Sequence, residues 1–311
     1  MTLPSLSGTL KVDFPEYVLA GEEINVLPTG FYRNDETDTL LTLYWVHPIS
    51  GARDTVRTET DPDTIGNDFI FEVPTDTVGK FTLSIYVAAE GYSLRSTVVS
   101  FTILNTELDE GSLRGYGFLD ELNTFEDTRD SYRYYYTTAA DGHDWMISNL
   151  AWNGAGDAFS GEEALSRIYG RYYTWNEAVN ACPEGWHLPS DADIINLALA
   201  YGGTSSDGVS VESGAGALMG NIYMNGSRMW EFWPDVRITN ASRLSLIPAG
   251  LAKLNNGKAL YGGLNDYAFL WTSDEVDGVS AKARYIYMDK PAVFVDAFGK
   301  ESVRASVRCM R

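Results

Sequence analysis

Aromatic rings and carboxylate or amide groups occur together in the segment 202–275, and these residue types can bind sugars or proteins. Tyr and Trp rings present flat apolar faces that can stack on a sugar ring. Asn and Asp oxygens can accept hydrogen bonds from sugar hydroxyls. The aromatic residues that could act in this way are Trp230, Phe232, Trp233, Tyr261, Tyr267 and Trp271. In a strand-rich segment the same rings can instead fill the core, so composition leaves both roles open.

The histidines do not suggest a metal site. His47, His143 and His187 are far apart in the sequence, and no carboxylate or cysteine stands near them at the spacing of zinc ligands. The sequence contains no G-x-S-x-G, no P-loop and no dinucleotide-binding glycine motif. We therefore expect no catalytic residues, no cofactor and no bound metal.

An acidic stretch after residue 60 partly matches a calcium-binding loop. Its residues at the first, third, sixth and twelfth positions of an EF-hand pattern are Asp61, Asp63, Gly66 and Glu72. The fifth position needs an oxygen ligand but is Ile65, and no flanking helices are predicted. We interpret this stretch as an acidic turn between strands.

The charge of the chain disfavours some classes of partner. Its 311 residues include 23 basic and 43 acidic side chains, which give a formal net charge of −20. Such a charge argues against nucleic acids and anionic membranes as partners, although it can serve solubility alone. No apolar run is long enough to span a bilayer, and the first residues show no signal peptide. A leader or lipid anchor removed earlier would leave the same sequence.

The N-terminal third of the chain is predicted to be an all-β sandwich. Strands are expected at residues 8–14, 23–27, 41–46, 68–73, 80–88 and 94–104. The clearest alternation places Phe81, Leu83, Ile85 and Val87 on one face. With a Tyr44-Trp45 pair in a middle strand, the pattern resembles the Ig-like or PKD-like modules of bacterial surface proteins. We expect this domain to span residues 1–106.

The next segment is predicted to be a linker because residues 107–117 are acidic, polar and contain glycine. A second domain is then expected over residues 118–311. It begins with a predicted hairpin around Asp141-Gly142. The Gly- and Ser-rich stretch 202–216 is predicted to be a loop.

Two short helices joined by a turn are predicted over residues 171–200. The first would carry, at helical spacing, Trp175, Ala178 and Ala181. Pro183 directly after Cys182 should end this helix. Ser190 and Asp193 form a predicted capping box for a second helix at residues 191–200.

Several spaced motifs resemble one bacterial family. They are DWMISNLAW at residues 144–152, YTWNEAVNACPEGWHLPS at 173–190, SLIPAGL at 245–251, FLWTSDE at 269–275 and SVRCMR at 306–311. In this order they resemble the Fibrobacter succinogenes major paralogous domain over residues 122–311. The resemblance implies a surface or secreted module and carries no catalytic residues with it.

A more distant resemblance is to the C-type-lectin-like fold, in which a helix with W-x-x-A-x-x-x-C precedes a final strand that carries a partner cysteine. The pattern here starts at Trp175 and ends at Cys182, and Cys309 stands in the last predicted strand. The resemblance implies an α+β C-type-lectin-like domain with a Cys182–Cys309 disulfide; two buried free thiols are the alternative. Trp271-Thr272-Ser273-Asp274 stands where a Trp-Asn-Asp calcium motif is expected, so calcium-dependent sugar binding is not implied.

The lectin-like resemblance places the ligand face in the region 202–271 and just after it. The binding residues that we predict there are Trp230, Trp233, Asn265, Tyr267 and Asp274. The expected function is non-enzymatic binding or adhesion, with an extracellular glycan or protein as partner, outside the cell or at the outer-membrane surface. Two alternatives stay open: a structural envelope or pilus component, and an enzyme of the formylglycine-generating type. The second would need an active-site cysteine, whereas Cys182 and Cys309 hold structural positions in the lectin-like fold.

Overall fold

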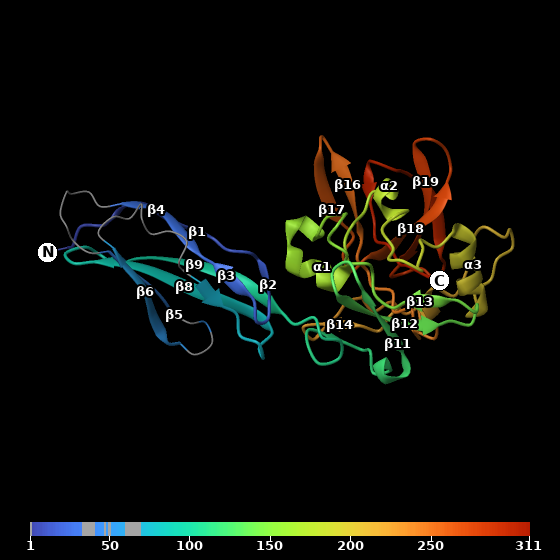
Figure 1. The fold of residues 1–311 in the computed structure, drawn as a ribbon, viewed down its shortest axis with the longest axis horizontal. Helices are drawn as coiled ribbons and strands as arrows, with labels where there is room; N and C mark the ends of the chain where they lie inside the picture. Colours follow the sequence, from blue (N-terminus) through green and yellow to red (C-terminus); the bar gives the residue numbers. More distant parts are fainter. Residues whose placement is uncertain (1, 33–40, 47, 49–50, 60–69) are drawn as a thin grey trace. The chain divides into compact units, whose positions relative to one another are not determined.

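The computed structural model describes residues 2–32, 41–46, 48, 51–59 and 70–311. It divides into two compact units, Met1–Asn105 and Thr106–Arg311 (Figure 1). The acidic stretch with Asp61, Asp63 and Gly66 lies outside the described residues, as does His47. None of the helices in the described ranges combines the length and the apolarity needed to cross a bilayer.

The described part of the N-terminal unit consists of strands in three sheets. The strands are β1 (Ser7–Asp13), β2 (Tyr17–Leu19), β3 (Glu23–Asn25), β4 (Leu27–Tyr32), β5 (Leu41–Val46), β6 (Arg53–Glu59), β7 (Ile70–Glu72), β8 (Gly79–Ala89) and β9 (Arg95–Leu104). The largest sheet has the order β2-β9-β8-β5-β6, and β1-β4 and β3-β7 form two smaller ones. This arrangement agrees with the all-β prediction.

One hydrophobic core joins these three sheets. Along β8, Leu83, Ile85 and Val87 are fully buried, as the alternating pattern predicts, and Phe81 packs at the edge of the same cluster. Phe71 of β7 and Leu10 of β1 reach this cluster from the smaller sheets. Tyr44 is buried and stacks on Tyr86, whereas the side chain of Trp45 lies outside the described residues.

The C-terminal unit has four three-stranded sheets. The first two have the order β10-β14-β15 and β11-β12-β13, and the others β17-β16-β21 and β18-β19-β20. Their bounds are β10 (Leu113–Arg114), β11 (Asn123–Asp127), β12 (Tyr132–Thr138), β13 (Asp144–Met146), β14 (Tyr223–Met224), β15 (Ser227–Arg228), β16 (Leu251–Asn255), β17 (Lys258–Gly262), β18 (Tyr267–Glu275), β19 (Ser280–Tyr287), β20 (Phe294–Gly299) and β21 (Val303–Arg304). This unit is therefore also mostly β.

The helices of the C-terminal unit are short. They are α1 (Glu163–Tyr169), α2 (Trp175–Ala178), α3 (Asp191–Ala200) and α4 (Ala215–Leu218), and α1 and α3 lie at opposite edges of the unit (Figure 1). The side chain of Ser190 accepts from the Asp193 N–H, and the Asp193 carboxylate accepts from the Ser190 N–H, so the predicted capping box is confirmed. The predicted span 191–200 is confirmed as well.

The segment 305–311 runs through the middle of the C-terminal unit. Its backbone pairs with Tyr173 at Ala305, with Leu270 at Ser306, and with both Trp145 and His187 at Met310. This places Cys309 beside Cys182, and the two form the predicted disulfide with Cα atoms 5.9 Å apart. The disulfide therefore ties the end of the α2 region to the last described segment of the chain.

The predicted linker is wrong, because residues 107–117 belong to the C-terminal unit. Leu113–Arg114 form β10 and pair with β14, and Leu113 and Tyr116 are buried. The Asp109 carboxylate accepts hydrogen bonds from the N–H groups of Gly115 and Tyr116, at 2.7 and 2.6 Å. Gly115 has φ +115°, and a Cβ there would collide with the Asn221 carbonyl oxygen. Asp109 thus stabilises a packed turn in a segment whose acidic, Gly-containing composition predicts a flexible linker.

Candidate binding site

The five predicted binding residues do not come together. Trp230 is 0% exposed and lies in the core beside residues of α3 and α4. Its indole Nε1 donates to the Leu246 carbonyl oxygen at 2.8 Å, so the ring and its polar atom are both satisfied inside the unit. The prediction for Trp230 is wrong, because the segment after β15 folds inward as part of the core.

Trp233 is 39% exposed and follows Phe232, which is 75% exposed. Both belong to the segment between β15 and β16, and Trp233 lines none of the hollows described below. Single exposed aromatic residues are common on protein surfaces and by themselves indicate no site.

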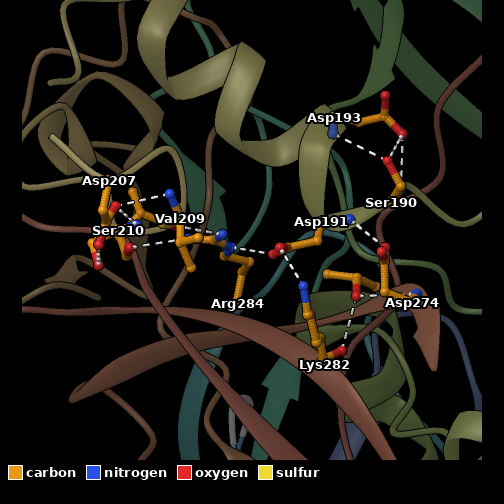
Figure 2. Close-up of polar contacts among 11 residues, drawn as sticks. Ser190, Asp191, Asp193, Asp207, Val209, Ser210, Asp274, Lys282 and Arg284 are labelled. Atoms are coloured by element: carbon orange, nitrogen blue, oxygen red, sulfur yellow. Dashed lines mark hydrogen bonds and ion pairs between the residues drawn. The ribbon is translucent and has the colours of Figure 1, made fainter. Parts of the chain in front are cut away.

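Asp274 caps a helix. Its Oδ2 accepts the backbone N–H of Asp191, at the start of α3, at 2.6 Å (Figure 2). A carboxylate near a helix N-terminus satisfies an N–H that has no partner within the helix and interacts favourably with the helix dipole. Asp274 therefore has a structural role through Oδ2, and it lines neither of the hollows described below.

The Asp191 side chain is the centre of a buried charge network (Figure 2). Its Oδ1 accepts from Arg284 Nε at 2.6 Å and its Oδ2 from Lys282 Nζ at 3.0 Å. Burial alone would raise the pKa of the Asp191 carboxyl, but hydrogen bonds and charges from Arg284 and Lys282 outweigh it, and the pKa lies below its usual value. The network ties α3 to β19.

The same network holds the loop after α3. Arg284 Nη2 donates to the Val209 carbonyl oxygen at 2.8 Å. Asp207 Oδ1 accepts the N–H groups of Val209 and Ser210 at 2.8 and 2.7 Å, and these bonds lower the pKa of Asp207 to about 2 (Figure 2). The charged groups at the centre of the network have partners inside the unit, so we assign it a structural role.

An open hollow lies where β18 begins and β19 ends. It measures about 410 Å³ and is lined by Asp266, Tyr267, Tyr287, Met288, Asp289 and Lys290. Tyr267 and Tyr287 are opposite each other in the antiparallel pair, and their ring centroids are 5.7 Å apart at 75°. Tyr287 is 38% exposed, and the ring of Phe294 supports it from β20 at 5.6 Å. The rings are thus fixed by the sheet and remain partly accessible.

The loop before β18 positions Tyr267. Gly263 has φ +78°, and a Cβ there would collide with the Tyr267 ring, so only glycine lets the ring lie against this loop. Asn265 is exposed, and its backbone N–H donates to the Pro248 carbonyl oxygen at 3.0 Å. Burial, the Tyr287 phenol and the Asp266 charge raise the pKa of Tyr267, so its hydroxyl stays protonated and can donate at neutral pH. Of the five predicted residues, Tyr267 lines this hollow and Asn265 lies in the adjoining loop.

The family follows from a match over most of the C-terminal unit. The model of the Fibrobacter succinogenes major domain matches residues 124–311, which is more than half of the chain. The chain belongs to this family. Its Fibrobacter succinogenes major domain includes the disulfide, α3 and the hollow between Tyr267 and Tyr287.

Other comparisons add little. No curated protein matches the chain. Among solved structures, the superoxide reductase (neelaredoxin) of Ignicoccus hospitalis is 13% identical over 30% of this chain and 80% of its own, with a TM-score of 0.23. A variant of the same enzyme is 12% identical over 31% of this chain and 80% of its own, with the same TM-score.

The hollow also contains residues that the sequence analysis missed. Tyr287, Asp289 and Lys290 stand about 20 residues beyond Tyr267 in the chain and carry no motif of their own. The signal that joins them to Tyr267 is the strand register of the Fibrobacter succinogenes major domain, which pairs Tyr267 with Tyr287. Within the described ranges, no three His, Cys, Asp or Glu residues are grouped so that they could hold a metal ion.

Proposed function

We propose that this chain is a non-enzymatic binding protein of the cell surface and that the hollow between Tyr267 and Tyr287 accepts an extracellular glycan. The accessible ring of Tyr287, held by Tyr267 and Phe294, supports this most strongly. A rigid, partly exposed aromatic ring offers contact area at little cost in conformational entropy. The volume of about 410 Å³ is in the range of small-ligand sites and suits one or two sugar rings.

Polar groups around the hollow fit the hydroxyls of a glycan. Asp266 is exposed beside Tyr267, and its carboxylate can accept hydrogen bonds. Lys290 pairs with Asp289 at 3.3 Å, and its ammonium is largely accessible, so it can donate to a sugar oxygen. A protein partner remains the second candidate, because aromatic anchors flanked by charges also dominate protein interfaces.

In this proposal the C-terminal unit has a C-type-lectin-like fold, and the N-terminal unit is an Ig-like spacer. A disulfide that closes a long loop suits the oxidising conditions outside the cytoplasm, which supports a location outside the cell or on the outer-membrane surface, with or without a lipid anchor. Binding of the glycan by this chain would then serve adhesion.

Two other functions receive less support. An enzyme of the formylglycine-generating type needs a reactive thiol, whereas both cysteines of the sequence are joined in the disulfide. A purely structural envelope or pilus component would need no accessible ring beside a hollow.

Glycan-array binding by the full chain, followed by titration with the best ligand, tests the proposal. Tyr287→Ala should weaken binding by about tenfold or more, because it removes the exposed ring. Phe232→Ala is the matched control, since Phe232 is a more exposed aromatic residue that does not line the hollow. Thermal unfolding of both variants shows whether a loss reflects folding. Equal binding by the Tyr287→Ala variant and the wild type would rule out this hollow as the site.

A further inference from the structure

A second cavity in the C-terminal unit lies away from the Tyr267–Tyr287 hollow and shares no lining residue with it. It measures about 490 Å³. Its walls are formed by the segment 106–120, β12, α1, residues 147–148, residues 245–247 and Arg308. The groups that decide its chemistry are Arg308, Arg167, Tyr116 and Tyr132.

Arg308 forms part of the cavity wall and is fully buried without a carboxylate partner among the described residues. Its Nη1 donates to the carbonyl oxygens of Met146 and Leu244, at 3.2 and 2.7 Å. Its Nε and Nη2 donate to Asn149 Oδ1, at 3.1 and 2.8 Å. A guanidinium has five N–H donors, so one Nη2 hydrogen remains without a partner in the described structure. Its positive charge is therefore solvated only by neutral oxygens.

The position of Arg308 is fixed by Asn149, which is itself held by the backbone of α1. Asn149 Nδ2 donates to the Tyr169 carbonyl oxygen at 2.8 Å, which turns Asn149 Oδ1 toward the guanidinium. Burial lowers the pKa of Arg308, but a guanidinium stays charged at neutral pH. A charge held in this way in a low-dielectric environment attracts an anion more strongly than a surface arginine does.

Arg167 brings a second guanidinium to the same cavity. It lies in the last turn of α1, and its Nη1 is buried with no hydrogen-bond partner among the described residues. The guanidinium lies 4.5 Å from the centre of the Tyr132 ring. An unpaired donor in such a place is costly unless a ligand or water accepts from it.

Two phenols add further donors. The Tyr116 and Tyr132 hydroxyls have no protein partner in the described ranges, and both residues line the cavity. Burial raises the pKa of each phenol, so both stay protonated at neutral pH. Tyr116 is held in place by the turn that Asp109 organises through the Tyr116 N–H. The inner wall thus presents donors from two cations and two phenols with few acceptors to match them.

The rim of the cavity is more acidic than its inner wall. Glu107, Glu110 and Asp120 are exposed and line its edge, together with the exposed Arg133. Their carboxylates repel long polyanions, and the net charge of −20 does the same. They can accept hydrogen bonds from the hydroxyls of a small ligand whose single anionic group reaches Arg167.

From these contacts we infer that the cavity binds a sugar that bears one oxyanion, either a carboxylate or a phosphate. The oxyanion lies beside Arg167, within the field of the buried Arg308 charge, and accepts from the Tyr116 and Tyr132 hydroxyls. The sugar hydroxyls donate to the carboxylates at the rim. A volume of about 490 Å³ accommodates one or two sugar rings.

Isothermal titration of the full chain with glucuronate, glucose 6-phosphate and glucose tests this inference. Tighter binding of glucuronate identifies the carboxylate, and tighter binding of glucose 6-phosphate identifies the phosphate; either result supports the site. Glucose should bind at least about tenfold more weakly than the better acid, because charge-assisted hydrogen bonds are lost. No saturable binding of either acid at millimolar concentration would overturn the inference.

Variants locate the binding. Arg167→Gln and Tyr116→Phe should each weaken binding of the better acid by about fivefold or more. Arg237→Gln is the matched control, because Arg237 is exposed and lines neither hollow. Thermal unfolding in the absence of ligand checks that each variant is folded. Binding to the Arg167→Gln and Tyr116→Phe variants as tight as to the wild type would overturn the assignment of this cavity.

Discussion

The buried charges around Asp191 and those around Arg308 lie in the same unit but are paired in different ways. Arg284 meets a carboxylate at 2.6 Å and a second acceptor at Val209 (Figure 2). Arg308 is as deeply buried and meets only carbonyl and amide oxygens. Burial alone therefore does not separate a structural arginine from a ligand-binding one. What separates them is that Arg284 has a carboxylate partner, whereas Arg308 has none in the described ranges and unpaired donors lie near it.

The largest effect should come from the disulfide, which anchors the residue next to Arg308. Cys309→Ser should lower the free energy of unfolding by about 4–5 kcal/mol, because the bond closes a long loop. Mass spectrometry of unreduced peptides and chemical denaturation check the bond and its effect. The Asp191 network should survive reduction better than the Arg308 cavity. Two alkylatable thiols in oxidised, folded protein would contradict the prediction.

Breaking the paired network should cost almost as much. Asp191→Ala leaves Arg284 buried without its counter-charge and should lower the free energy of unfolding by about 3–5 kcal/mol. Asp235→Ala removes an exposed carboxylate and serves as the control. Denaturant titration compares the two. A loss for Asp191→Ala no greater than that for the control would show that the network contributes little to stability.

Acid should weaken the Asp191 network but leave the Arg308 region paired as before. The pKa of Asp191 is lower when folded than its usual value of 3.8, so its contribution is complete above that value and is lost as the pH falls further. Stability measured between pH 5 and pH 3 should therefore fall more steeply in the wild type than in the Asp191→Asn variant. Parallel curves would mean that Asp191 is not held in its charged form.

The smallest effect should follow from removing an unpaired donor. Tyr116→Phe removes a hydroxyl that has no protein partner in the described ranges, so unfolding in the absence of ligand should change by less than about 0.5 kcal/mol. Differential scanning calorimetry measures this. A loss of more than about 1 kcal/mol would reveal a partner within the protein and weaken the contrast with the paired network.

Local signals predicted much of the fold. The capping box at Ser190 and Asp193 identified α3 because its hydrogen bonds join residues three apart. The β-branched and alternating residues of β8 and β9 identified those strands. Strands β2, β4 and β6 were missed: β2 has only three residues, β4 contains Pro28 and Gly30, and β6 is mostly polar. Strands of this kind depend on pairing rather than on intrinsic preference.

The candidate sites were much harder to predict. Trp230 and Trp233 are three residues apart, yet one fills the core and the other is exposed, since the path of the chain after β15 decides between them. The acidic residues of segment 107–117, Asp109 among them, suggested a linker, but the Asp109 carboxylate accepts two backbone N–H groups and stabilises a packed turn. Tyr287 joins Tyr267 only through strand register, and Arg308 meets Leu244 and Asn149 only in the folded unit. These contacts join residues that are far apart in the sequence, and composition does not report them.

The central position of segment 305–311 also has a consequence for protein synthesis. The Leu150 N–H donates to the Val307 carbonyl oxygen, so this part of the core cannot close until more than 150 further residues have been made. At about 5–20 residues per second, that wait lasts roughly 10–30 s. The N-terminal unit makes its contacts within Met1–Asn105 and can fold first. During the delay the apolar strands around Trp145 lack the partners that the last segment supplies, so this is the interval in which a chaperone would act, whereas a thiol oxidase can join Cys182 only after Cys309 has been made.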